Sequence, residues 1–406
     1  MDKTKIIEFI QSVGDGGAET LVKDYAQLLD KEQFEVTVVV LHGVENSANL
    51  QRLKEHRIRI VELSSQDDFL KKIWRSVFWK KEKVVVKSED VQEKPVLPGE
   101  TYEEETFIRR CRNRIRNLYF GMKFLNVLRQ TGATVVHAHL DMLGCLCSVR
   151  WLLKGVRLFH TCHALPKLIY AGEEGRAAHS LIRHNGLQLI ALHADMAAEM
   201  DVMFPEQKTQ VIRNGVNMNV FQNPGVTKEE KRRTLSLPQD AFLVGHVGRF
   251  TPEKNHPFLI EVFREIVRRE ENAYLLMIGA EDNIHIRQKL KEYGLEERYQ
   301  ILSGRKDINE LLAAMDVFVF PSVFEGFPVS VIEAQAAGLR CIVSAQIPEA
   351  VVRTETCSPM PLSDPETWAD AALNTELTRP NPLDLYEYDM NREIRRLERL
   401  YLGHSD

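Results

Sequence analysis

The chain has 406 residues, with 53 Lys and Arg against 58 Asp and Glu, a formal net charge of −5 at pH 7, and 44% hydrophobic residues. This length predicts two domains, and the composition excludes a collagen, a coiled coil or a disordered protein. The charge balance gives no reason to expect a nucleic-acid partner. The six cysteines form no Cys-x-x-Cys pair, and no apolar run is long enough to span a membrane. We therefore expect a protein of the reducing cytoplasm.

The first half of the chain alternates short β-branched runs with amphipathic stretches. Strands are expected at residues 6–10, 35–41, 58–63, 134–137, 156–160 and 187–192, and a helix at 18–29. The N-terminal run mixes charged and apolar residues, which indicates a first strand and not a signal peptide. Continuously apolar strands with helical crossovers are typical of a parallel sheet covered on both faces. We predict a doubly wound α/β domain over residues 1–205.

The second half repeats this scheme. Strands are expected at residues 242–247, 274–279, 299–302, 317–320 and 341–344, with helices at 256–269 and 308–314. They predict a second doubly wound domain over residues 206–384, joined to the first by a segment that carries the Asn214-Gly215 turn signal. Residues 385–406 are strongly helical and follow a Pro-rich break. This terminal helix can cross back to the first domain.

An insertion at about residues 64–118 interrupts the strand pattern. Residues 71–83 contain six basic and three aromatic side chains, residues 84–107 are acidic, and residues 108–117 contain five arginines. The middle reads as a mobile loop and the flanks as basic amphipathic helices. The basic and aromatic side chains of the flanks are Lys71, Lys72, Trp74, Arg75, Phe78, Trp79, Lys80, Lys81, Arg109, Arg110, Arg112, Arg114 and Arg116.

Two interpretations of these flanks stay open. Aromatics at helical spacing surrounded by Lys and Arg are typical of a helix lying on an anionic membrane surface. The same pattern fits a solvated helix whose aromatics face the core. A nucleic-acid patch would need more basic surface elsewhere in the chain.

The most informative motif is DVFVFPSVFEGFPVSVIEAQAAG, at residues 316–338. It reads as a buried strand, a loop with Glu325 and Gly326, and a helix that starts after Pro328. Ligands of doubly wound sheets bind beyond the carboxyl ends of the strands, where this loop lies. Amides at a helix start suit a phosphate, and Glu325 and Glu333 can each accept hydrogen bonds from hydroxyls of an extended ligand. On spacing alone, a helix-start loop with two solvated glutamates fits equally well.

A second motif is GHVGRFTPEK, at residues 245–254. After a strand, Gly248 opens a loop from which Arg249 and Lys254 project. Two cations beside a helix start are what a departing diphosphate requires. In isolation, however, such an Arg and Lys are more often ordinary surface charges.

Two weaker signals belong to the first domain. GDGGAE, at residues 14–19, is a Gly-rich turn at a helix start, although Glu19 stands where the dinucleotide fingerprint has a third glycine. Histidine pairs follow two strands, His137 with His139 and His160 with His163. They lack zinc spacing with a third ligand nearby, and the chain has no Asp-x-Asp pair, so we expect neither a metal nor a cofactor.

Taken in order, GGAE, VVHAH, VIRNGV, VGRFTPEKN, LLMIGA and FPSVFEGFPVSVIEAQAAG resemble the retaining family-4 glycosyltransferases of the GT-B fold. The resemblance runs from about residue 5 to 350 and includes a Glu-(seven residues)-Glu pattern. It implies two Rossmann-like domains facing a cleft. The C-terminal domain would bind a nucleotide sugar, and the N-terminal domain would receive the acceptor.

The resemblance also implies roles for individual residues. Glu325 would hold a donor-sugar hydroxyl, and Glu333 the ribose hydroxyls. Arg249 and Lys254 would neutralise the leaving diphosphate, and His139 would contact the transferring sugar, with His163 and His137 as further candidates. The remaining donor contacts would come from Gly16, Gly17, Gly248, Ile308, Gly326, Phe327, Pro328, Val329 and Ser330.

The resemblance further implies a metal-independent enzyme of surface-glycan synthesis. Its donor would be a nucleotide sugar, most simply a UDP-sugar, and its acceptor a lipid-linked or polysaccharide glycan at the inner face of the cell membrane. Two alternatives stay open. One is an enzyme of the same fold with a soluble acceptor or an epimerase activity. The other is a non-catalytic partner that binds a nucleotide sugar.

Overall fold

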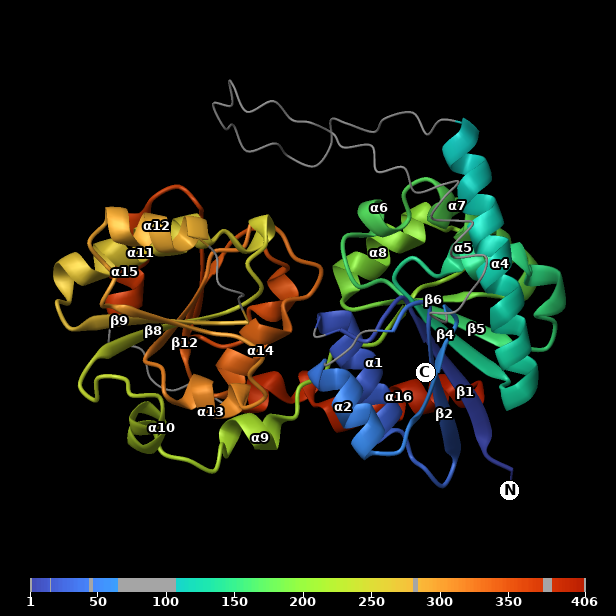
Figure 1. The fold of residues 1–406 in the computed structure, drawn as a ribbon, viewed down its shortest axis with the longest axis horizontal. Coiled ribbons are helices and arrows are strands. Elements are labelled where there is room, and N and C mark those ends of the chain that lie inside the picture. Colours follow the sequence, from blue (N-terminus) through green and yellow to red (C-terminus); the bar gives the residue numbers. More distant parts are fainter. Residues whose placement is uncertain are drawn as a thin grey trace.

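The computed structural model describes residues 2–14, 16–43, 47–64, 107–279, 284–374 and 382–404. It contains two parallel sheets, one in each lobe of the molecule (Figure 1). The first sheet is seven-stranded with the order β3-β2-β1-β4-β5-β6-β7, and the second is six-stranded with the order β10-β9-β8-β11-β12-β13. The predicted α/β class with two doubly wound sheets is confirmed.

The strands of the first sheet are β1 (Thr4–Ile10), β2 (Phe34–Val40), β3 (Arg59–Glu62), β4 (Val135–His139), β5 (Arg157–Thr161), β6 (Gln188–Ala191) and β7 (Gln210–Val211). The helices of this half are α1 (Gly17–Leu28), α2 (Ala48–Glu55), α4 (Phe107–Thr131), α5 (Leu143–Ser148), η1 (Arg150–Leu152), α6 (Pro166–Ile169), α7 (Glu173–Asn185) and α8 (Ala194–Met203). Apolar residues such as Ile7, Phe9 and Val136 are fully buried, because helices cover both faces of the sheet.

The second sheet contains β8 (Phe242–Val247), β9 (Ala273–Ile278), β10 (Tyr299–Leu302), β11 (Val317–Phe320), β12 (Arg340–Ser344) and β13 (Cys357–Met360). Its helices are α9 (Met218–Gln222), α10 (Lys228–Thr234), η2 (Pro252–Lys254), α11 (His256–Arg269), α12 (Ile284–Glu292), α13 (Ile308–Ala313), α14 (Val329–Ala336), η3 (Glu349–Val351), α15 (Pro365–Leu373) and η4 (Pro382–Tyr388). All neighbouring strands of this sheet pair in parallel, so their carboxyl ends share one edge.

The last helix, α16 (Met390–Leu402), lies in the lobe of the first sheet, although η4 before it belongs to the other lobe (Figure 1). Its buried side chains recur every three or four positions, at Met390, Ile394, Leu397 and Tyr401, and so share one face. This face packs against β1, α1 and β4 in a cluster with Ile6, Tyr25 and Val135. The two sheets are therefore tied together by a second passage of the chain.

Replacing Leu397 with alanine is expected to destabilise the fold by about 2–5 kcal/mol, because it leaves a cavity at a fully buried position. Leu402→Ala, at the half-exposed end of the same helix, is the matched control and should cost under about 1 kcal/mol. Urea denaturation of both variants measures the difference. Equal losses would show that α16 is not anchored through this face.

The two passages between the domains run side by side. Val216 donates from its backbone amide to the Tyr388 carbonyl at 2.7 Å, and the Met390 amide donates to the Val216 carbonyl at 3.1 Å. Gly215 lies so close to Met390 that an added Cβ would come within 2.5 Å of its Cα. Glu387 accepts ion pairs from Arg213 at 3.1 Å and Arg353 at 2.5 Å. Hydrogen bonds, close packing and ion pairs thus hold the two connecting segments together.

The basic segments are described only in part. The residues from Lys71 to Lys81 lie outside the described part, and Arg109 and Arg110 lie in α4 without described side chains. Arg114 and Arg116 are exposed on α4 and Arg112 is half-buried. The exposed stretch also contains Ile115, Leu118 and Met122, each at least half exposed. No helix within the described ranges is both long and apolar enough to cross a membrane.

Candidate functional site

The loop between β11 and α14 makes direct contact with the first domain. A Cβ added to Gly326 would lie 2.7 Å from the His163 carbonyl oxygen and 2.7 Å from the Ala164 Cα. Since no side chain fits in that space, the glycine permits the two backbones to touch. Burial lowers the pKa of His193, which caps the start of α8, and the adjacent Gly326 backbone partly opposes this shift. The carboxyl ends of β5, β6 and β11 therefore meet at this loop.

Two of the residues singled out by sequence pair with each other. The Lys254 ammonium donates to Glu325 Oε1 at 2.6 Å, and the Ser322 hydroxyl donates to the same oxygen at 2.5 Å. Lys254 also lies 4.7 Å above the ring of Phe320. Both charged groups are largely buried, so each neutralises the other in the absence of a ligand. Arg249, the second predicted cation, is exposed.

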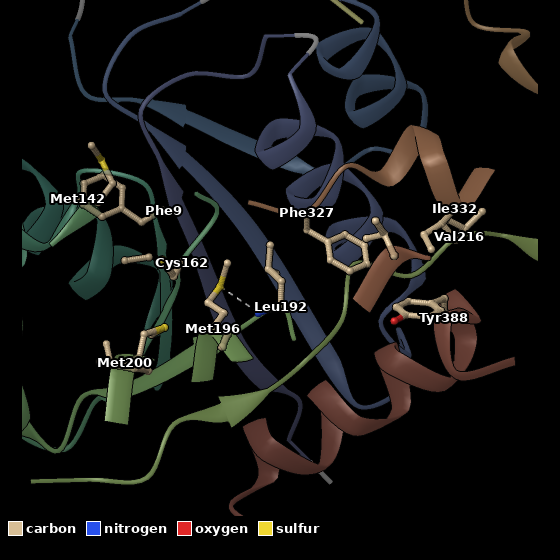
Figure 2. Packing of buried hydrophobic residues seen from close by; sticks show 14 of the residues in the cluster. Phe9, Met142, Cys162, Leu192, Met196, Met200, Val216, Phe327, Ile332 and Tyr388 are labelled. Atoms are coloured by element: carbon tan, nitrogen blue, oxygen red, sulfur yellow. Dashed lines mark hydrogen bonds between the residues drawn. The ribbon is translucent and has the colours of Figure 1, made fainter. Parts of the chain in front are cut away.

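The helix start after this loop has the predicted form. Pro328 is the N-cap of α14 and is buried, and Val329 and Ser330 form its first turn. These first amides have no partner within the helix and are available to an anion. Phe327 is buried 5.7 Å from the ring of Tyr388. One apolar cluster holds Phe327 and Ile332 together with Leu192 and Met196 of the first domain (Figure 2).

Glu333, on the second turn of α14, faces the first domain. The pKa of its carboxyl is raised to about 7, first because burial removes water from it and second because the Asp24 carboxylate of α1 repels it. The Lys23 ammonium partly opposes this shift in pKa. Glu333 therefore titrates near neutrality, and its charge depends on an element of the opposite domain.

If Glu333 accepts ribose hydroxyls as a carboxylate, affinity for UDP should fall as the pH falls through 7. Protonation removes the charge that strengthens these hydrogen bonds, so about a tenfold loss is expected between pH 8 and pH 6. Titration calorimetry with UDP at both pH values measures it. In Glu333→Gln the loss should shrink to the part caused by the phosphate's own protonation. An unchanged loss in that variant would contradict the role of Glu333.

The other donor candidates occupy three separate places in the structure. Gly16 is the N-cap of α1 and Gly17 is its exposed first residue. Gly248 follows β8, where an added Cβ would lie 2.9 Å from the His246 ring and 3.2 Å from Lys254. Ile308 is the half-buried first residue of α13. The structure places Gly248 beside the Lys254–Glu325 pair and gives no direct contact for Gly16, Gly17 or Ile308 with that pair.

The histidines lie deeper than their place at strand ends suggested. His137 and His139 project from the same side of β4 with ring centroids 4.2 Å apart, and both are fully buried. His139 Nε2 lies 2.7 Å from Glu8 Oε2, and its Nδ1 lies 2.9 Å from His163 Nε2. Of these histidines, His163 alone is partly exposed, so the group that reaches the cleft surface is His163.

We predicted that the histidines lack a third ligating group nearby, and this prediction is wrong. Glu8 of β1 brings a carboxylate into the group, and the donor atoms of Glu8, His137 and His139 lie within 4.8 Å of one another. Parallel pairing of β1 with β4 places Glu8 opposite His137, a relation that spacing along the chain cannot show. We assign no metal to them, because each of these nitrogen and oxygen atoms already has a hydrogen-bond partner.

A cavity of about 250 Å³ opens beside Glu325 between the domains. The first domain lines it with the start of α6 and the first two turns of α8, including His193, Asp195 and Glu199. The second domain lines it with Glu325 and the loop from Gln346 to Pro348. Its volume is below the roughly 300–1,000 Å³ of pockets for drug-sized ligands.

Two family profiles match the chain, one to each domain. The profile described as Glycosyltransferase Family 4 covers residues 84–220, and the one described as Glycosyl transferases group 1 covers residues 241–375. The chain belongs to the family-4 glycosyltransferases. It is 30% identical over 256 residues to the Escherichia coli UDP-Gal:alpha-D-GlcNAc-diphosphoundecaprenol alpha-1,3-galactosyltransferase, and 28% identical over 244 residues to the putative glycosyltransferase EpsF of Bacillus subtilis. Each match covers 58% of this chain.

The matches cover 64% and 63% of the lengths of these two relatives. Among solved structures, Anabaena HepE in complex with UDP and glucose superposes with a TM-score of 0.70 at 17% identity, over 98% of this chain and 100% of that one. WaaG, a glycosyltransferase of lipopolysaccharide biosynthesis, gives 0.64 at 13% identity, over 98% and 100%. These likenesses show the fold of the family-4 chain, and that fold is GT-B.

Proposed function

We propose that this family-4 chain is a retaining glycosyltransferase that moves a sugar from a UDP-sugar to a lipid-linked glycan. The observation that carries the proposal is the Lys254–Glu325 pair, held against the first domain by Gly326. A cation, a carboxylate and free helix-start amides meet there at the edge of both sheets. HepE was solved with UDP and glucose, and the E. coli relative is named for a lipid-diphosphate acceptor, which favours these two substrates.

The chemistry follows from this arrangement. Departure of a nucleoside diphosphate places negative charge on a phosphate oxygen, and Lys254 and Arg249 stabilise it from the same loop. When the donor binds, the Lys254 ammonium leaves the Glu325 carboxylate and pairs with the diphosphate. Glu325 is then free to accept a hydrogen bond from a hydroxyl of the donor sugar. With no protein nucleophile required, catalysis rests on positioning and on charge stabilisation. The acceptor approaches through the cavity beside Glu325, where Asp195 and Glu199 accept hydrogen bonds from its hydroxyls.

The proposed location of the enzyme is the inner face of the cell membrane. The exposed part of α4 joins arginines with Ile115, Leu118 and Met122, and an amphipathic basic helix of this kind binds anionic lipid. We expect co-sedimentation with anionic vesicles at low salt and a steep loss of binding as salt rises. Neutral vesicles are the control. Absence of binding to anionic vesicles at low salt would contradict this location.

A panel of nucleotide sugars in a thermal-shift assay tests the donor. A ligand present at 100 times its Kd stabilises the folded state by about 2.7 kcal/mol, so the true donor should raise the melting temperature more than UDP alone. An assay of sugar transfer to a lipid extract then distinguishes the proposed glycosyltransferase from the two alternatives. Product formed only with lipid supports the proposal, whereas conversion of the nucleotide sugar without acceptor indicates an epimerase. Binding without any turnover indicates a non-catalytic partner.

A further inference from the structure

A buried chain of hydrogen bonds runs from the C-terminal helix to the boundary between the domains. The Tyr401 hydroxyl of α16 donates to Glu8 Oε1 at 3.0 Å. Glu8 Oε2 lies 2.7 Å from His139 Nε2, and His139 Nδ1 lies 2.9 Å from His163 Nε2. His163 then reaches the partly exposed boundary, where its backbone touches Gly326. Its other ring nitrogen, Nδ1, has no hydrogen bond within the described residues.

The surroundings fix which atoms can exchange protons. His137 Nε2 lies 2.7 Å from the Thr161 hydroxyl, and His137 Nδ1 lies 2.5 Å from the Tyr401 hydroxyl. If the Thr161 hydroxyl donates to His137 Nε2, the His137 proton lies on Nδ1 and donates to the Tyr401 oxygen. The Tyr401 hydroxyl proton must then donate to Glu8 Oε1. Only the bonds from Glu8 to His139 and from His139 to His163 then remain reversible.

Two arrangements of protons satisfy these two bonds. With Glu8 protonated, Oε2–H donates to His139 Nε2, the His139 proton on Nδ1 donates to His163 Nε2, and the His163 proton is on Nδ1. With Glu8 ionised, His139 Nε2–H donates to Glu8, His163 Nε2–H donates to His139 Nδ1, and His163 Nδ1 is a free acceptor. The arrangements differ by one proton, which enters or leaves at His163 Nδ1.

We propose that Glu8 determines, through His139, whether His163 presents a hydrogen-bond donor or an acceptor to a ligand between the domains. The protonated arrangement suits a ligand oxygen that can only accept, as in a phosphate. The ionised arrangement suits a hydroxyl that donates. Glu8, His139 and Tyr401 are positioning residues in this account, and His163 is the group that touches the ligand.

Both arrangements are accessible near neutral pH. Burial raises the pKa of Glu8 to about 8, while the hydrogen bond from Tyr401 acts to lower it. Burial lowers the pKa of His139 to about 3 and that of His163 well below its usual value, so both rings stay neutral. The other titratable groups facing this chain are Tyr25 of α1, His137 of β4 and His160 of β5, and burial disfavours the charged form of each.

Imidazole nitrogen NMR on the full-length protein between pH 6 and 9.5 tests the proposal without any substrate. The His139 and His163 signals, assigned with His163→Gln, should change tautomer together with a midpoint near 8. In Glu8→Gln, the amide N–H donates to His139 in place of the carboxyl, so both rings should keep the protonated-Glu8 form at every pH. In Tyr401→Phe, loss of the donor to Glu8 should move the midpoint up by about 0.5–1 pH unit.

Each outcome decides the proposal. A single His163 tautomer across the range in the wild type, or the same switch in Glu8→Gln, overturns it. If Glu8→Gln fails to fold, an unchanged midpoint in Tyr401→Phe overturns it. One equivalent of zinc in the purified wild type that is absent from Glu8→Gln also overturns it, in favour of a metal centre. Because no substrate is used, none of these results bears on the proposed transfer.

Discussion

Replacing Lys254 or Arg249 with alanine is expected to lower kcat for sugar transfer by about 10²–10³-fold. In the proposed mechanism, each cation stabilises charge that develops on the leaving diphosphate, and removal of one such group from a preorganised site costs this much by analogy with a lost oxyanion donor. Steady-state kinetics with saturating donor measures the loss. The donor KM should change far less than kcat, because the interaction strengthens in the transition state.

The two variants control for each other. Lys254→Ala leaves the largely buried Glu325 without its cation, so this variant should lose some stability as well as activity. Arg249 is exposed, so Arg249→Ala should keep the wild-type melting temperature and show the catalytic effect alone. Arg233→Ala, at an exposed arginine of α10, is the matched control. Near-normal turnover in both site variants would remove these residues from the mechanism.

Gly326→Ala is expected to lower kcat/KM by about 10²-fold. The added methyl would lie 2.7 Å from the His163 carbonyl oxygen and from the Ala164 Cα. Backbone atoms cannot yield as the end of a flexible side chain does, so the loop must withdraw from the first domain. A displacement of about 1 Å at a reacting centre is enough for a loss of this size. Kinetics together with small-angle scattering tests the expectation, since the domains should also move apart.

Gly43→Ala is the matched control for this substitution. A Cβ at Gly43 would lie 2.4 Å from the exposed Glu62 carboxylate, which can swing away. Activity and dimensions should therefore stay as in the wild type. If Gly326→Ala retained full activity with unchanged scattering, the contact between the loop and the first domain would have no part in function.

Much of the fold could be predicted because the strands of a parallel sheet appear in the sequence as short apolar runs separated by helical stretches. β8 and β11 are short, mostly apolar runs followed by Gly248 and Pro321, so their predicted limits match the structure. β13 was missed because Pro359 argues against a strand, yet it is tolerated at the edge of the sheet. β7 was missed because two residues carry no periodicity.

The site was predictable only where its residues are close in sequence. Glu325, Gly326 and the start of α14 form one continuous motif, and local rules for strand ends and helix starts apply to it. Glu8, Asp24 and Tyr401 could not be found, because each reaches the site through strand pairing, domain contact or the crossing of α16. The one sequence signal for Glu8 was its charge, which is unusual inside the apolar run of β1.

The most direct test of the account is release of nucleoside diphosphate from UDP-sugars by the purified protein, with and without an extract of lipid-linked acceptors. Release from at least one UDP-sugar should depend on the extract, accompany transfer of the sugar to lipid, and fall about 10²–10³-fold in Lys254→Ala. Release that Lys254→Ala leaves unchanged, or no release and no binding with any nucleotide sugar, would contradict it.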